Sequence, residues 1–109
     1  MSAPAVRVID RTLAALADPH RRQVVDLLRE QPRRAGDLAH VLGLSAPTMS
    51  RHLKALRDAR VVEEFSPESD ARVRIYRLRP QPMAHLKQWL EETERLWTEQ
   101  AAAAKAHGG

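Results

Sequence analysis

The chain of 109 residues contains no cysteine, and it has only four glycines, one phenylalanine and one tyrosine. Without cysteine it can form neither disulfides nor thiolate metal sites, which fits a reducing compartment. No apolar run approaches the roughly 20 residues that a membrane span needs, and the N-terminus lacks the apolar core of a signal peptide. We therefore expect a cytoplasmic protein that forms a single domain over residues 1–109 and makes no contact with membranes.

The sequence motifs of common enzymes are also missing. There is no cysteine nucleophile, no glycine-rich phosphate loop and no G-x-S-x-G nucleophile elbow. Four glycines and short connections between the predicted elements leave little room for a catalytic pocket. We therefore predict that the protein is not an enzyme and carries no cofactor.

The chain does have an excess of basic residues, with a formal net charge of +4. Such an excess favours an anionic partner such as nucleic acid, although many basic proteins bind none. Much of the excess falls between residues 44 and 60, where Asp58 is the only acid. The basic residues of this stretch are Arg51, Lys54, Arg57 and Arg60.

The same stretch predicts an amphipathic helix over about residues 45–59. Ser45 can serve as its N-cap by accepting a free N–H group of the first turn. Pro47 falls inside that turn, where a missing N–H costs nothing. Hydroxyl and basic side chains lie near the N-terminus, which is where a recognition helix meets base edges and phosphates. Apolar residues recur at i, i+4 and i+7 on the other face: Met49, Leu53 and Leu56.

Three more helices are predicted before this one. Asp18 and Pro19 separate the first two, since aspartate caps a helix and proline suits its first position. Gly43 stops the third helix, so the third and fourth helices form a helix-turn-helix. The three predicted ranges are about 5–17, 19–30 and 35–42.

Two arginines, Arg21 and Arg22, fall in the first turn of the second helix, where cations oppose the helix dipole. An external anion or an acidic neighbour would explain this placement. Simple solvation of the two side chains is an equally weighted alternative.

Residues 61–79 predict a β-hairpin, which we call the wing. Its two strands are rich in β-branched and aromatic residues, over about 61–66 and 73–78, and a turn-rich segment separates them. Four arginines of the tip and returning strand balance four acids of the outgoing strand and turn, so the wing has no net charge. Cross-strand ion pairing explains these charges as well as the functional alternative does. In that alternative, Arg72 and Arg74 reach a DNA backbone or minor groove.

A last helix is predicted over about residues 82–105, with an apolar stripe at heptad-like spacing that includes both tryptophans. Too little chain remains to cover this stripe, and a monomer would expose an apolar patch. We expect a second copy of the chain to cover it, with folding back onto the chain's own core as the alternative. The predicted dimer interface consists of Ile9, Leu13, Met83, Leu86, Trp89, Leu90, Thr93, Leu96 and Trp97.

The order of these elements and several short strings resemble the ArsR family of winged-helix transcriptional repressors. The strings are Leu16-Ala17-Asp18-Pro19-His20-Arg21-Arg22, Asp37-Leu38-Ala39, Leu44-Ser45-Ala46-Pro47-Thr48-Met49-Ser50-Arg51-His52-Leu53-Lys54-Ala55-Leu56 and Arg74-Ile75-Tyr76-Arg77-Leu78. The resemblance covers about residues 11–96. It implies a mainly α (α+β) fold, a winged helix-turn-helix with a two-stranded wing and terminal dimerisation helices. It also implies a homodimeric repressor of its own or a neighbouring operon, bound to a pseudo-palindromic operator in double-stranded DNA.

The resemblance implies roles for individual residues as well. Ser45 would cap the recognition helix and hold a phosphate, and Lys54 would contact a phosphate. Arg72 and Arg74 would act from the wing, while His52 would pack or contact a phosphate. The residues facing bases would be Ala46, Pro47, Thr48, Ser50 and Arg51.

Members of this family that sense metals use two kinds of site, one of which lacks its cysteine ligands here. For the other, the last helix offers His85, Glu91, Glu92, Glu94 and His107, with a solvated acidic face as the favoured alternative to a metal site. Founding members use a cysteine pair at the start of the third helix, where this chain has Arg34 and Gly36. Others bind zinc between the last helices of two subunits; here His85 and Glu92 share a face but lie too far apart to chelate one ion alone. We therefore expect the metal-independent branch of the family, without a metal sensor. Two further histidines are single residues without ligand spacing: His20 and His40.

The alternative function is a protein-interaction module, in which a winged helix docks a different protein through its C-terminal helix. A tight homodimer would favour the repressor, whereas a monomer that binds a different protein would favour the module.

Overall fold

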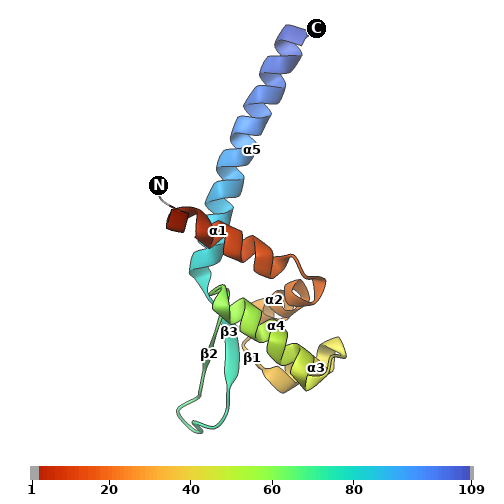
Figure 1. Cartoon of the computed structure of the whole chain (residues 1–109), viewed down its shortest axis with the longest axis vertical. Coiled ribbons are helices and arrows are strands. Elements are labelled where there is room, and N and C mark those ends of the chain that lie inside the picture. The colour runs from red at the N-terminus through yellow and green to blue at the C-terminus, as the bar shows by residue number, and fades with distance from the viewer. Residues whose placement is uncertain (1–2, 109) are drawn as a thin grey trace.

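The computed structural model describes residues 3–108, and side chains from residue 8 onward. Five helices and three short strands follow one another along this part of the chain. Figure 1 shows helices and strands gathered into a body, with a hairpin reaching out at one end and the last helix projecting from the other. In chain order the elements are α1 (Ala3–Leu16), α2 (Pro19–Glu30), β1 (Arg33–Arg34), α3 (Ala35–Leu42), α4 (Ala46–Asp58), β2 (Val62–Phe65), β3 (Ile75–Leu78) and α5 (Pro80–Gly108).

The helix boundaries follow the capping residues that the sequence indicated. The carboxylate of Asp18 accepts hydrogen bonds from the backbone N–H groups of His20 and Arg21, at 2.8 and 3.2 Å, and so caps α2. Gly43 ends α3 in the left-handed conformation, with φ 66°. Its N–H donates to the carbonyl of His40, and the N–H of Leu44 donates to that of Ala39, the two bonds of a Schellman motif.

The end of α4 repeats this motif without a glycine. Arg60 has φ 61°, a left-handed conformation that side chains with a Cβ rarely adopt. Its N–H donates to the carbonyl of Arg57, and the N–H of Val61 donates to that of Leu56. The chain therefore turns sharply from α4 into β2 at the cost of local backbone strain.

The core lies where α2, α3 and α4 meet the start of the sheet. The predicted stripe of α4 is buried there, together with apolar residues of the two preceding helices and of the chain entering β2. Burial of this apolar surface fixes the orientation of α4 about its own axis. The largest fully buried apolar side chains are Val24, Leu38, Met49, Leu53, Leu56, Val61 and Val62.

The sheet has three antiparallel strands in the order β1-β3-β2, which are the predicted two-stranded wing of β2 and β3 and a third strand, β1, that the sequence did not predict. In β2 and β3, Val62 pairs with Leu78 and Phe65 pairs with Ile75. The unexpected strand β1 pairs Arg33 with Tyr76 on the other side of β3. It has only two residues, too few to show an alternating pattern in the sequence.

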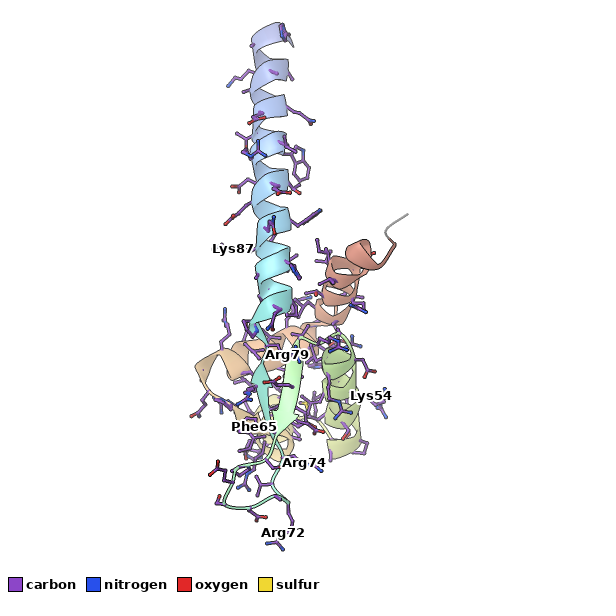
Figure 2. All side chains as sticks on the ribbon, turned by 90° about the vertical axis from the view of Figure 1, so that its left-hand side faces the viewer. Lys54, Phe65, Arg72, Arg74, Arg79 and Lys87 are labelled. Atoms are coloured by element: carbon purple, nitrogen blue, oxygen red, sulfur yellow. The ribbon has the colours of Figure 1, made fainter. Side chains whose placement is uncertain are left out.

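Helix α5 leaves the body rather than folding back onto it. The structure measures 64 Å in its longest dimension, and the outer part of α5 extends alone in both views (Figures 1 and 2). Helix α1 packs against the lower part of α5, where Met83 and Leu86 are partly buried. The alternative that α5 covers its whole stripe with the chain's own core is therefore wrong. In the part of the chain that the structure describes, no helix is both long and apolar enough to cross a membrane.

Candidate nucleic-acid interface

The outer face of α4 carries the residues that the sequence singled out. Because the stripe of α4 is buried, the opposite side of the helix faces solvent. Ser50, Arg51 and Lys54 are exposed on it. At the N-terminal end Ala46 and Pro47 are exposed too, in the first turn of the helix. The fold thus presents short polar side chains and two cations together on one surface.

The start of α4 is held by a chain of hydrogen bonds among three of these residues. The hydroxyl of Ser45 accepts the backbone N–H of Thr48 at 3.3 Å, which confirms the predicted N-cap. The same hydroxyl donates to Oγ1 of Thr48 at 2.9 Å, and the guanidinium of Arg51 donates to that oxygen at 3.2 Å. This network holds the side chain of Arg51 toward the N-terminal end of the helix.

Further along the helix, Lys54 makes an ion pair with Asp58 one turn away, with Nζ and Oδ2 2.7 Å apart. The hydrogen bond from Lys54 holds the pKa of Asp58 below its ordinary value, against a smaller opposing effect of desolvation. Both side chains are well exposed, so this pair is easily exchanged for another partner. Lys54 is therefore available to an anion that approaches α4.

The wing arginines divide into two groups. On β3 and just beyond it, Arg77 and Arg79 pair with Glu63 at 2.8 and 3.5 Å, which confirms cross-strand ion pairing for this pair of residues. The guanidinium of Arg77 also lies over the ring of Phe65, 4.1 Å from its centroid. These charges therefore stabilise the hairpin itself.

The remaining two arginines lie toward the tip of the wing. Arg72 is 92% exposed and pairs with its near neighbour Asp70 at 3.1 Å. Arg74 is exposed, and it makes no ion pair with any residue that the structure describes. In Figure 2 both arginines lie at the end of the molecule remote from the projecting part of α5, with Lys54 on the nearby helix. The fold thus places basic groups of α4 and of the wing at the same end.

A residue that the sequence reasoning missed connects the wing to α4. Glu64 of β2 pairs with Arg57 of α4 at 3.0 Å. Partial burial, followed by a hydrogen bond with Glu64, raises the pKa of the Tyr76 hydroxyl on β3. Glu64 therefore ties β2 to α4, and its carboxylate lies close to the Tyr76 hydroxyl on β3. Charge alternation in the sequence could not reveal these partners, because Arg57 lies on α4 and Tyr76 lies on the opposite strand.

Arg21 and Arg22 have a different partner from those that we expected. Arg22 donates to the carbonyls of Leu16 and Ala17 at 2.8 and 3.1 Å, and Arg21 reaches the carbonyl of Ala15 at 3.5 Å. These carbonyls form the negative end of α1. The two arginines therefore cap the preceding helix, and neither an external anion nor an acidic side chain is needed to explain their position.

The predicted dimer residues are only partly covered. Trp97 is 70% exposed, and Trp89, Leu90 and Leu96 are exposed on the same helix. Trp89, Thr93 and Trp97 line a shallow hollow of about 620 Å³. On α1, Leu13 is exposed and Ile9 is partly buried beside α5. A monomer thus leaves an apolar face on the outer part of α5, as the sequence predicted.

This arrangement of helices and wing can now be compared with known proteins. Residues 18–64 match the family model described as bacterial regulatory protein, arsR family. The chain is 40% identical over 89 residues to HTH-type transcriptional regulator Rv2034 of Mycobacterium tuberculosis, which covers 82% of this chain and 78% of that protein. The chain belongs to the ArsR family. It is therefore a DNA-binding transcriptional regulator with a winged helix-turn-helix fold and not an enzyme, as predicted.

Two further proteins similar to this ArsR-family member differ in how much they cover. Transcriptional repressor SdpR of Bacillus subtilis is 36% identical over 56 residues, which is 51% of this chain and 62% of that protein. A solution structure of the homodimeric winged helix-turn-helix DNA-binding domain of Mb0332 from Mycobacterium bovis aligns with a TM-score of 0.67 and 26% identity. That alignment covers 90% of this chain and 88% of the other.

Of the two kinds of metal site that the resemblance suggested, the cysteine site does not fit the residues present, and one chain alone cannot form the site on α5. At the start of α3, Arg34 offers a guanidinium and Gly36 no side chain, so neither can replace a thiolate ligand. On α5, His85 and Glu92 are exposed on one face, but seven residues of helix separate them by roughly 10 Å along the axis. One chain therefore cannot chelate an ion with this pair.

The prediction that His20 is an isolated histidine is wrong, because the fold brings a second histidine beside it. Its ring lies beside that of His52 on α4, with the ring centroids 5.7 Å apart and the planes tilted by 54°. His52 is partly buried and also accepts a hydrogen bond at Nδ1 from Nε of Arg21, at 3.4 Å. His52 thus packs as expected and also contacts the N-terminal end of α2.

Proposed function

We propose that this ArsR-family regulator is a homodimeric repressor of its own or a neighbouring operon. Its operator would be a pseudo-palindrome in double-stranded DNA, contacted by one α4 and one wing from each subunit. The observation that carries the proposal is the shared placement of the exposed face of α4 and of Arg72 and Arg74 in the wing, toward the end of the molecule remote from the outer part of α5 (Figure 2). DNA and a second subunit can then bind without competing for the same surface.

The contacts of α4 support a division of labour along the helix. The exposed N-terminal residues would face base edges in the major groove, where side chains distinguish all four base pairs. Arg51 would leave Thr48 to form a bidentate contact, and Lys54 would exchange Asp58 for a phosphate. Ser45 would hold a phosphate at the N-terminus of the helix. The base-facing set remains Ala46, Pro47, Thr48, Ser50 and Arg51.

The wing would act beside the helix on the adjacent DNA backbone or minor groove. Arg74 is exposed, and Arg72 can exchange its local pair with Asp70 for a phosphate. Arg77 and Arg79 are already committed to Glu63 within the hairpin. We therefore assign DNA contact to Arg72 and Arg74 and a structural role to the other two arginines.

The homodimer rests on the exposed apolar face of α5 and on the similar solved domain that is itself homodimeric. Pairing of two such faces would remove both tryptophans from water. The contributing residues would be the nine named from the sequence, with Met83 and Leu86 nearest the body. We propose that DNA binding itself needs no metal, because Arg34 and Gly36 replace the cysteine pair and one α5 cannot chelate an ion with His85 and Glu92 alone.

Binding to a labelled DNA fragment from upstream of the protein's own gene, measured against scrambled DNA at several salt concentrations, tests the proposal. We expect a preference of about 10³-fold or more for the upstream fragment, with a steep loss of affinity as salt rises. Arg51→Ala should cost about 1–3 kcal/mol and relax specificity at one base position. Lys54→Ala and Arg74→Ala should weaken binding to all sequences alike and each reduce the salt slope by about 1.

Arg29→Ala is the matched control, because it removes an exposed arginine of the same charge that pairs with Asp26 at the far end of α2. Arg77→Ala is the comparison for Arg74→Ala within the wing. It should lower the stability of the hairpin through loss of the contacts with Glu63 and Phe65, whereas Arg74→Ala should remove a DNA contact. Unchanged affinity in both Arg51→Ala and Lys54→Ala would refute the assignment of α4. A monomeric protein that shows no DNA preference would instead support the protein-interaction module.

A further inference from the structure

Three potential metal ligands meet where the N-terminus of α2 touches α4. Asp18 is the cap of α2, His20 lies in its first turn, and His52 lies in the middle of α4. One ligand atom from each side chain lies within 4.8 Å of the other two. His20 and His52 are 32 positions apart in the sequence, so only the fold brings them together.

We propose that these three side chains form a binding site for a divalent transition-metal ion, with Zn²⁺ as the ion that fits best. Two imidazole nitrogens and one carboxylate oxygen are the ligands of many zinc sites that keep a fourth, open position. Ligand atoms around such an ion lie roughly 3–3.5 Å apart, given metal–ligand bonds of about 2.0–2.1 Å. The three ligand atoms lie within 4.8 Å of one another, so binding of an ion would draw them together by roughly 1–2 Å, and the exposed side chain of His20 has room for such a movement.

The surroundings of the cluster favour a defined site over three unrelated surface groups. Oδ1 of Asp18 is held by the backbone N–H groups of His20 and Arg21, so the carboxylate is already oriented. Hydrogen bonds of this kind position the ligands in metal sites. Asp18 and His52 are partly buried and His20 is exposed, so the site is both structured and open to an ion from solvent.

One neighbouring group opposes the ion. Nε of Arg21 donates to Nδ1 of His52, and the guanidinium brings a positive charge next to the site. At 3.4 Å this hydrogen bond is long and therefore weak. Arg21 also reaches the carbonyl of Ala15 in α1, so it can retain a partner when His52 turns to the metal. Because Arg21 competes with the ion for His52, removal of its charge should raise the affinity for zinc, whereas removal of a ligand should lower it.

A bound ion would join the N-terminus of α2 to α4 through His52, next to Arg51 in the sequence. It would therefore restrict movement of the helix that carries the candidate DNA contacts. The metal site itself stands apart from the proposed repressor function, because binding of the ion can be measured on the protein without DNA. The site also differs from those considered on α3 and α5, since it shares no residue with them.

Calorimetric titration of the purified full chain with Zn²⁺, supported by titration with Co²⁺ followed by visible absorption, tests the site. We expect one ion per chain in the wild type. His20→Gln, Asp18→Asn and His52→Gln should each lower the affinity at least about 10-fold. Asp18→Asn is informative because asparagine also caps helices, so α2 keeps its N-cap while the carboxylate is lost. Arg21→Met, which keeps an unbranched side chain but removes the guanidinium and its charge, should bind zinc several-fold more tightly.

His40→Gln and His85→Gln are matched controls, since each removes one exposed histidine outside the cluster, and both should bind zinc as the wild type does. Circular dichroism of each variant separates loss of ligand from loss of fold, and the exposed His20→Gln variant keeps the test decisive if His52→Gln unfolds. Absence of saturable binding at micromolar zinc would overturn the proposal. So would equal affinity in His20→Gln and wild type, or a loss confined to His85→Gln.

Discussion

Replacement of Trp97 by alanine should dissociate the proposed dimer. In one chain this side chain is 70% exposed on the outer part of α5. A tryptophan presents up to about 250 Å² of surface, which leaves about 175 Å² of Trp97 for a partner to cover. At about 25 cal/mol per Å², covering that area contributes about 4 kcal/mol for each copy.

Part of this gain is offset by the cost of ordering the interface, and alanine still buries some area. We therefore expect Trp97→Ala to cost about 2–3 kcal/mol per copy, or about 4–6 kcal/mol for a symmetric dimer. Such a loss raises the dissociation constant by roughly 10³- to 10⁴-fold. Sedimentation equilibrium over a range of protein concentrations measures this shift directly.

Helicity provides a second readout of the same change. The outer part of α5 has no neighbouring element of its own chain in Figure 1, and isolated helices of this length are marginal in water. The far-ultraviolet circular dichroism should therefore fall as Trp97→Ala is diluted into monomers. Lys87→Ala on the same helix is the control, because Lys87 is exposed and pairs with Glu91 one turn away. A dissociation constant for Trp97→Ala equal to that of the control would refute the placement of the interface on this face.

Two further predictions concern stability. Arg60→Gly should raise the free energy of unfolding, measured with urea, by about 0.5–1 kcal/mol. Glycine removes the strain of the left-handed backbone at φ 61°, and this gain exceeds the loss from its greater conformational freedom in the unfolded chain. A urea midpoint below that of the wild type would show that the side chain of Arg60 stabilises the fold by more than the strained backbone destabilises it. Asp58→Asn should reduce the loss of stability on acidification, since Lys54 lowers the folded-state pKa of Asp58 below its usual 3.8. A carboxylate whose pKa is lowered by folding stabilises the fold at pH values above its unfolded-state pKa. This stabilisation is lost as the pH falls through the folded-state pKa. Urea unfolding at a series of pH values checks this, and identical acid dependence in the variant and wild type would contradict it.

Local sequence signals were sufficient for the helices. The caps at Asp18, Gly43 and Ser45 act on backbone groups within a few residues, so the boundaries of α2, α3 and α4 could be predicted closely. The strand β1 could not, because two residues become a strand only when β3 is placed beside them. Burial of the α4 stripe also predicted which face of that helix is exposed, while the DNA-contact roles on that face stay a prediction.

Contacts between distant residues were beyond the sequence for the same physical reason. The guanidinium of Arg22 meets the end of α1 only after the chain turns at Asp18, and nothing in the linear charge pattern distinguishes a carbonyl cap from an exposed cation. His20 likewise looked isolated, because His52 approaches it only when α4 packs across α2. Helical periodicity describes one element at a time and therefore cannot report which ends of two elements meet.

The carboxylate of Glu64 has a consequence for how this regulator can diverge. Its ion pair with Arg57 fixes the paired part of the hairpin to α4, while residues 66–74 lie beyond the paired strands. Exposed loop tips tolerate substitution and changes of length better than the elements that carry them. Descendants of this chain could therefore exchange the tip for one of another length or charge, and acquire new DNA preferences there, while the helices and their core remain unaltered.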